Sequence, residues 1–216
     1  MPGSGFLTHW QLTQEEIDEI ISSNPSLRGM LFGYVSEYKL RKHWFANERI
    51  TNLVKEDDHN HLQKGDLFFT YKGVSISVEV KCLQTHTVRR LGDDAYRGKF
   101  QCDASDRRRV LFPDGTSLET TCLRVGEFDL LAVGLFEFGQ QWRFAFARNS
   151  DLPHSRYKKY TPEQQRYLLA TLMDITWPLQ PPYEAEPFRL LDIIALEKRT
   201  GATADKIMPP VVPPEE

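Results

Sequence analysis

Near the N-terminus, apolar residues recur at the three- to four-residue spacing of an amphipathic helix. Residues 13–16 (TQEE) form a capping box, which predicts the start of a first helix. Asn24 followed by Pro25 predicts a second helix, because Asn is a favoured cap and Pro is tolerated at the first helical position. Gly29 and Gly33, one turn apart, predict close packing of this helix against another element. Its apolar stripe comprises Leu27, Met30, Leu31, Tyr34, Val35 and Tyr38.

From about residue 50 the apolar pattern changes to the period of two that is typical of strands. Residues 67–71 precede a second alternating segment, and Lys72-Gly73 between them suits a two-residue hairpin turn. Residues 128–138 are almost continuously apolar, as in a central strand covered on both faces, and residues 142–147 are expected to pair with it. In the alternating segment, the apolar residues that are expected to face the core on one side of the strand are Val74, Ile76, Val78 and Val80.

The C-terminal part of the chain mixes clear and ambiguous signals. A second capping box at residues 161–164 (TPEQ) predicts a helix that continues to about residue 174. Residues 190–197 fit a short helix or a strand, and periodicity does not decide between them. The order helix, helix, hairpin, strands, helix predicts an α/β fold with a central mixed β-sheet flanked by helices.

Length and composition limit the class of protein. The 216 residues are 40% hydrophobic and 26% charged, which fits a globular protein and excludes a disordered chain, a collagen or a coiled coil. We expect one domain over residues 1–200, with a core at about 26–148 and a C-terminal helical part at about 160–200. The proline-rich residues 201–216 predict a disordered tail.

Charge and cysteine content bear on partners and location. The formal net charge is -3, so any nucleic-acid site must be a local basic patch. No apolar run approaches the roughly 18 residues of a membrane span, and the N-terminus lacks a signal peptide. Three cysteines without CxxC spacing indicate reduced thiols, so we expect a cytoplasmic protein with no membrane partner. The basic clusters that could follow phosphates are Arg89-Arg90, residues 107–109 and residues 156–160.

The hairpin carries the residues with the clearest chemistry. With Lys72-Gly73 as the turn, Asp66 lies directly opposite Glu79 on one face of the sheet. Lys81, two residues further on, shares that face. A solvated strand face would explain these residues, but opposed carboxylates are destabilising unless a cation lies between them. Mg²⁺ is typically held by one or two carboxylates together with water and phosphate oxygens.

Gly65-Asp66, twelve intervening residues and Glu79-Val80-Lys81 on a hairpin after an N-terminal helix resemble the PD-(D/E)xK nuclease superfamily. The resemblance covers roughly residues 26–148, and Gly65 stands where the family name has proline. It implies a restriction-endonuclease-like core and an endonuclease of restriction or repair type that hydrolyses DNA phosphodiester bonds. It also implies that Asp66 and Glu79 bind Mg²⁺, with Mn²⁺ as a substitute and the Val80 carbonyl as a further ligand. Lys81 would position or deprotonate the attacking water, or stabilise charge on the phosphate.

Two further residues enter through the same resemblance. In many members a glutamate on the first core helix joins the metal site, and Glu37 is the candidate here; a solvated helix glutamate is the alternative. Gln84 is similar to the polar residue that often follows the catalytic strand, where it orients water or contacts phosphate. A glutamine at a loop edge is the alternative for Gln84, and Gln101 on a strand at 96–105 is expected to point at substrate.

Other interpretations stay open at this stage. The alternative is a catalytically idle module on the same fold that binds nucleic acid or takes part in an assembly. His59 and His61 suggest a zinc hydrolase, although no further ligands follow at a recognisable spacing. Asp129 begins the central apolar strand and needs a partner, for which an arginine is expected. Cutting both DNA strands with one site per chain favours a homodimer.

Overall fold

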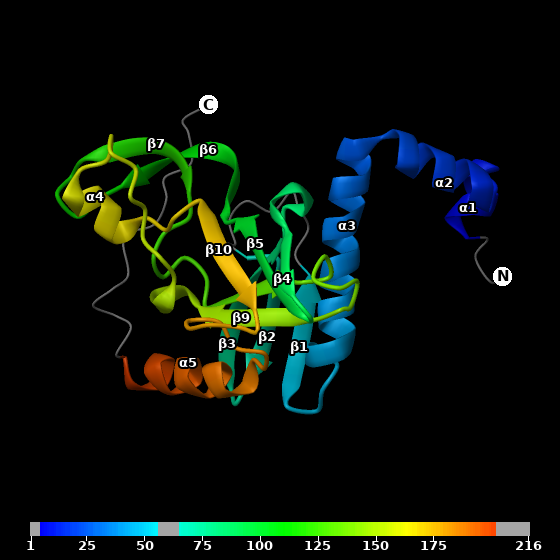
Figure 1. The fold of residues 1–216 in the computed structure, drawn as a ribbon. Helices are drawn as coiled ribbons and strands as arrows, with labels where there is room; N and C mark the ends of the chain where they lie inside the picture. The colour runs from blue at the N-terminus through cyan, green and yellow to red at the C-terminus, as the bar shows by residue number, and fades with distance from the viewer. Residues whose placement is uncertain (1–4, 56–64, 202–216) are drawn as a thin grey trace.

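The computed structural model describes residues 5–55 and 65–201 and confirms an α/β architecture with a central mixed sheet flanked by helices (Figure 1). The first three strands of this sheet form an antiparallel meander, the third pairs in parallel with the fourth, and the fourth pairs antiparallel with the fifth. In spatial order the strands are β1 (Ile50–Lys55), β2 (Leu67–Tyr71), β3 (Val74–Cys82), β8 (Leu130–Gly134) and β9 (Phe144–Arg148).

The predicted hairpin is confirmed in its turn and its register. Tyr71 pairs with Val74 and Leu67 with Val78, across the two turn residues. Lys72 and Gly73 have φ of 48° and 75°, as the left-handed turns that join tight hairpins require. The two-residue turn alone is therefore sufficient to specify the register of the hairpin.

Each face of the central sheet supports its own hydrophobic core. On one face Val78 and Val80 pack with Leu130, Ala132 and the buried side of α5 (Phe188–Thr200). On the other face Leu131 and Val133 of β8 pack with side chains that include Phe100, Met173 and Ile175. All five residues of β8 are buried, which confirms the predicted central strand.

A second layer of strands covers the face of the sheet that carries Glu79 and Lys81. It contains a three-stranded sheet in the order β10 (Leu172–Trp177), β5 (Ala95–Gln101) and β4 (Arg89–Gly92). A two-stranded ribbon of β6 (Asp103–Leu111) and β7 (Ser117–Cys122) continues from it. Short 3₁₀ turns lie at Thr85–Thr87 and Asn149–Asp151.

The helix predicted from residue 161 to about 174 is much shorter. Its capping box is present, but α4 covers only Pro162–Tyr167. Residues 172–177 instead form β10, because Met173 and Ile175 are buried on one parity and the backbone pairs with β5. The part predicted as helical therefore contains a strand between α4 and α5.

The N-terminal helices depart most from the prediction. They are α1 (Phe6–Trp10), α2 (Gln14–Ser23) with its predicted capping box, and α3 (Pro25–Leu40), which runs into a π-helical turn at Arg41–Phe45. The cap predicted from Asn24 is absent, because its side chain bonds to the carbonyl of Ile20 instead.

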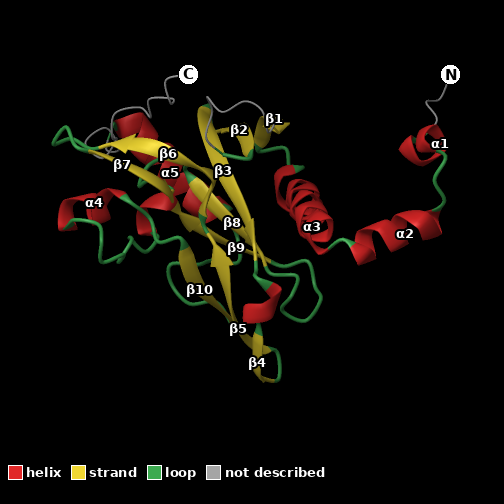
Figure 2. Ribbon diagram, turned by 90° about the horizontal axis from the view of Figure 1, so that it is seen from above, coloured by secondary structure: helices red, strands yellow, loops and turns green. Residues whose placement is uncertain are grey.

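The apolar stripe of α3 is not buried against the body. Only Ser36 and Leu40 of this helix are buried, and an added Cβ at Gly29 or Gly33 would meet nothing within 4 Å. The close packing predicted from these glycines is therefore wrong. Figure 2 shows α1 and α2 projecting away from the body beyond α3. None of the helices within 5–55 and 65–201 combines the length and apolar character that crossing a bilayer requires.

Candidate active site

The structure brings the two predicted carboxylates together at the end of the hairpin. Asp66 lies directly before β2, and its backbone N–H donates to the carbonyl of Val78 over 2.8 Å. Its Oδ2 accepts the backbone N–H of Val80 over 2.6 Å. The regular β2–β3 pairing ends at Leu67 and Val78, and these two bonds fix Asp66 just beyond it. Asp66 lies close enough to Glu79 for its charge to raise the pKa of that residue.

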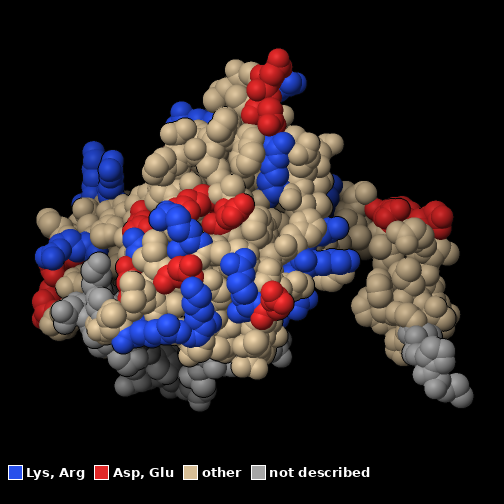
Figure 3. Space-filling model, turned by 90° about the horizontal axis from the view of Figure 1, so that it is seen from below, with Lys and Arg blue, Asp and Glu red and all other residues tan. Residues whose placement is uncertain are grey.

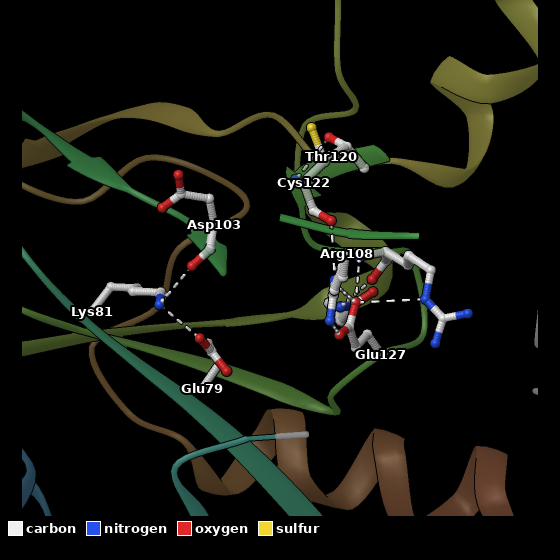
Figure 4. A network of polar contacts seen from close by, with 9 residues as sticks. Glu79, Lys81, Asp103, Arg108, Thr120, Cys122 and Glu127 are labelled. Atoms are coloured by element: carbon white, nitrogen blue, oxygen red, sulfur yellow. Dashed lines mark hydrogen bonds and ion pairs between the residues drawn. The ribbon is translucent and has the colours of Figure 1, made fainter. Parts of the chain in front are cut away.

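Lys81 joins the same cluster. Its Nζ lies 2.7 Å from Oε1 of Glu79 and donates to the carbonyl oxygen of Asp103 over 3.1 Å (Figure 4). The ammonium group therefore bridges β3 and the first residue of β6. The parity argument from the sequence placed Glu79 and Lys81 on one face, and the ion pair confirms that placement.

The cluster is buried, so a merely solvated strand face is ruled out for Glu79. This residue is 9% exposed, and its burial raises the pKa of its carboxyl group to about 7 although Lys81 opposes the shift. Burial likewise raises the pKa of Asp66, against the charge of Lys81 and the Val80 hydrogen bond. Burial would lower the pKa of Lys81, but the charge and hydrogen bond of Glu79 outweigh it and raise that pKa. Both acids are thus costly to ionise in the metal-free protein.

Gly65 stands at the position where the PD-(D/E)xK motif has proline, and its backbone conformation suits glycine. Its φ is +123°, and an added Cβ would lie 3.2 Å from the carbonyl oxygen of Val78. Proline fixes φ near -65°, so it cannot adopt this backbone. Glycine is the residue that lets the chain turn sharply into Asp66 at this point.

The donor set fits a hard divalent cation. Hydrogen bonding and ion pairing occupy Oδ2 of Asp66 and Oε1 of Glu79. The second oxygen of each carboxyl group has no hydrogen bond to the residues that the structure describes. Two adjacent buried carboxylates suit Mg²⁺, which uses one or two protein carboxylates and completes its shell with water. No group of three or more His, Cys, Asp or Glu side chains within the described ranges is arranged to hold a metal.

Glu37 lies close enough to this cluster for its charge to act on Asp66. Its side chain is 14% exposed, and Oε2 pairs with Nζ of Lys55 over 2.6 Å. Both charges act on the pKa of Asp66, Glu37 raising it and Lys55 lowering it. Lys55 was not predicted from the sequence, because its contact with Glu37 joins β1 to α3 and no residue spacing indicates it.

Gln84 and Gln101 lie at the margin of the cluster. The Nε2 group of Gln84 donates to Oε1 of Gln101 over 3.0 Å, and Gln101 in turn donates to Oδ2 of Asp103 over 2.7 Å. Because the backbone carbonyl of Asp103 holds Lys81, this chain of amides supports the lysine from outside. Neither glutamine bonds to Asp66 or Glu79 in the described part of the chain.

A second ion-pair cluster lies beside the site. Arg108 pairs with Glu127 through both nitrogens of its guanidinium fork and donates to the carbonyl of Cys122 (Figure 4). Arg124 Nε lies 3.6 Å from Oε2 of Glu127, whose side chain is 1% exposed. Arg108 belongs to the basic cluster predicted to follow phosphates, but it points inward and anchors the β6–β7 ribbon.

Asp129, directly before β8, has a partner of a different kind from the one predicted. Asp129 pairs with Lys198 of α5 over 2.6 Å and accepts from Ser77, so the expected arginine partner is wrong. The lysine is available because α5 packs along the same end of the sheet. His59 and His61 lie outside the described residues, as does most of the predicted C-terminal tail.

The three cysteines are free, as the sequence predicted. Burial raises the pKa of the Cys82 thiol to about 11, so this residue is a half-buried thiol of low reactivity. It packs on the side of β3 away from Glu79.

Most residues of the three predicted basic clusters are exposed, and in the cluster at 107–109 Arg107 and Arg109 are exposed while Arg108 turns inward. Arg89, Arg90, Arg156, Lys158 and Lys159 all face solvent. Figure 3 shows basic and acidic side chains interspersed over one side of the body rather than segregated. Any phosphate-binding surface therefore consists of short clusters of Lys and Arg among acidic side chains.

Comparison with known proteins finds no sequence relative and a distant structural likeness. No protein-family model and no curated protein matches the sequence. Among solved structures, a bacterial homing endonuclease, I-Ssp6803I, is similar at 15% identity, over 85% of this chain and 98% of that one, with a TM-score of 0.33. A likeness this distant does not identify what the chain does.

Proposed function

We propose that this chain is a metal-dependent endonuclease that hydrolyses DNA phosphodiester bonds, of restriction or repair type and with a PD-(D/E)xK site. The observation that supports this most is the convergence of Asp66, Glu79 and Lys81 at one buried point of the hairpin. Two carboxylates and an ammonium group are the side chains that phosphodiester hydrolysis assisted by a hard cation requires.

Asp66 and Glu79 are the residues that would hold Mg²⁺ or Mn²⁺, with the carbonyl of Val80 as a further ligand. The bound cation would supply an acidified water and offset negative charge on the phosphate. The carboxylates hold their places through the chain itself, because the Val80 N–H fixes Asp66 and Lys81 fixes Glu79. Glu37 is the nearby third carboxylate proposed to assist them.

Lys81 has a separate task in this proposal. An ammonium group has three N–H donors, and two of them are directed at Glu79 and at the carbonyl of Asp103. The third can meet a non-bridging phosphate oxygen, where negative charge gathers in the transition state. Gln84 and Gln101 keep the Asp103 carbonyl in place and so orient the lysine.

The proposed substrate is DNA, bound through the exposed basic groups at Arg89-Arg90 and at residues 156–160. Tyr157 is 51% exposed within the second group and offers a flat surface beside its cations. Aromatic and basic side chains interleaved in this way suit contact with phosphates and bases.

The test is incubation of supercoiled plasmid with the full chain in Mg²⁺, in Mn²⁺ and in EDTA. We expect nicked or linear DNA with either metal and intact DNA in EDTA. Tight binding in a gel-shift assay without any cleavage in Mg²⁺ or Mn²⁺ would contradict the proposal and identify a binding module instead.

A further inference from the structure

Apolar side chains exposed to water are concentrated on the three N-terminal helices. Of thirteen exposed large hydrophobic residues in the described part of the chain, eight lie between residues 6 and 38. Trp10 is 64% exposed and Met30 is 62% exposed. The eight residues, here called the arm surface, are Phe6, Trp10, Ile20, Leu27, Met30, Leu31, Tyr34 and Tyr38.

This surface lies on helices that their own chain does not bury. Neither α1 nor α2 contains a buried residue, and α3 buries only Ser36 and Leu40. Helices of 5 and 10 residues are marginal in water without tertiary packing. Figures 1 and 2 show α1 and α2 extending away from the body. Large exposed apolar surfaces in soluble proteins commonly mark interaction sites, and this concentration on one projecting arm is the reason to look for a partner there.

The charges that flank this surface complement those of a second copy of the chain. The segment from residue 5 to residue 27 contains no Lys or Arg, and its acidic residues are Glu15, Glu16, Asp18 and Glu19. The first basic residue is Arg28 in the first turn of α3, which donates to the carbonyl of Ser22. The end of α3 and the following turn are basic, with Lys39, Arg41 and Lys42. Within 5–55 and 65–201, neither the four acidic side chains nor these three basic ones take part in an ion pair, although Lys39 lies over the ring of Trp142 and Lys42 over that of Tyr38. Figure 3 shows the projecting arm largely uncharged, with acidic side chains gathered on it.

An antiparallel pair of α3 helices would match these charges. In such a pair the end of one α3 lies beside the start of the other, where α2 is attached. The basic residues of each copy then face the acidic helix of its partner, twice over, as two-fold symmetry requires. The eight residues of the arm surface would form the apolar centre of this contact, and the polar residues of the three helices would form its rim.

We propose that this protein forms a two-fold symmetric dimer through α1, α2 and α3, with the arm surface of each copy covered by the other. The acidic α2 of one copy lies against the basic end of α3 in its partner. This inference rests on exposure and charge, and it does not depend on the proposed nuclease function. It gives a location to the homodimer that two-strand cleavage favours.

The first test is the mass of the full chain in solution, measured by light scattering during size-exclusion chromatography at micromolar concentration. We expect twice the chain mass of 25.1 kDa. Leu27→Glu with Met30→Glu should weaken the dimer at least about tenfold, because it places charges in the apolar centre of the interface. The matched control is Leu196→Glu on α5, where the leucine is also 62% exposed, and this variant should remain a dimer.

A wild-type chain that is monomeric under these conditions overturns the proposal. So does a dimer that Leu27→Glu with Met30→Glu leaves intact, since the contact would then lie elsewhere. Circular dichroism of each variant confirms that the body is folded. No DNA enters this measurement, so its outcome is separate from that of the nuclease assay.

Charge reversal tests the pairing itself. Glu15→Lys with Glu19→Lys should weaken the dimer, and so should Lys39→Glu with Lys42→Glu. Combining all four substitutions restores opposite charges across the two-fold axis and should restore the dimer. A combined variant that remains as weak as either double variant overturns the antiparallel arrangement.

Discussion

Asp66 and Val80 are joined by a hydrogen bond of 2.6 Å from the backbone N–H of Val80 to the carboxylate Oδ2 of Asp66. Val80 lies between Glu79 and Lys81, so this bond fixes the carboxylate of one strand to the backbone that carries the other two site residues. It occupies one oxygen of Asp66 and leaves the other for a ligand. The position of the site therefore depends on the backbone at Gly65 and Asp66 as much as on side chains.

Gly65→Ala should destabilise the protein by about 1–3 kcal/mol, because alanine is strained at a positive φ and its Cβ would crowd the Val78 carbonyl. Thermal and chemical unfolding measure the change. Gly92→Ala is the control, because its Cβ would meet only Ala95 at 3.9 Å. Its effect should stay below about 1 kcal/mol. Equal loss of stability in the two variants would show that Gly65 has no special role.

The pH dependence of stability should reveal the buried carboxyl group of Glu79. Its pKa is about 7 in the folded chain and 4.5 in an unperturbed one, so the folded state holds its proton over this range. The free energy of unfolding in EDTA should therefore fall as pH rises from about 4.5 through about 7. Glu79→Gln removes this contribution, on the order of 1–3 kcal/mol. Parallel pH profiles for wild type and variant would contradict the assignment.

Lys81→Met should slow cleavage by about 10²- to 10⁴-fold, because it removes a positioned cation from the reacting phosphate. DNA affinity in Ca²⁺ should change little, since one contact among many is lost. The strand should survive, because Val78 and Val80 carry its burial. Single-turnover rates and Ca²⁺ binding isotherms separate these effects, with Lys99→Met as the control. Lost affinity with an unchanged rate at saturating enzyme would make Lys81 a phosphate anchor.

DNA binding should be electrostatic despite the net charge of -3. Each phosphate contact contributes about 0.9 to the slope of log affinity against log salt. Lys158→Gln with Lys159→Gln should therefore flatten the slope by up to about 1.8 if both lysines contact phosphate. The same measurement on Arg89→Gln with Arg90→Gln tests the second basic group. A slope that neither double variant changes would locate the DNA surface elsewhere.

The hairpin could be predicted because its information is local. A two-residue turn and strict alternation over residues 74–81 fix which side chains oppose one another, and the predicted register holds from Tyr71 and Val74 to Leu67 and Val78. Asp66, one residue further on, lies near Glu79, but its N–H bonds to the carbonyl of Val78 and departs from this register. The double burial of β8 could be predicted for the same reason, since an unbroken apolar run needs cover on both faces.

Helical period did not reveal whether a partner surface exists. The stripe on α3 has the right spacing but stays largely exposed, and only Ser36 and Leu40 of this helix are buried. The capping box at residue 161 likewise marks where a helix starts and carries no information about where it ends. Residues 172–177 became a strand because β5, distant in sequence, offers an edge for pairing.

The ion pairs around the site depended on contacts that no spacing shows. Arg108 meets Glu127 because the β6–β7 ribbon shifts register between Asp103 and Arg108 and turns the guanidinium inward. Lys55 meets Glu37 across β1 and α3 after a bulge. In both cases the charged residues are visible in the sequence, but their partners depend on irregular strand pairing.

The most direct measurement is single-turnover nicking of supercoiled plasmid in Mg²⁺ by wild type, Asp66→Asn and Glu79→Gln. The control is Glu163→Gln, which removes a carboxylate that pairs with Arg166 on α4. Wild type and control should nick the DNA, and neither should do so in EDTA. Each of the two site variants should lose at least about 10² in rate while circular dichroism shows a folded protein. A wild-type rate in either site variant, or cleavage that persists in EDTA, would contradict a metal site at Asp66 and Glu79.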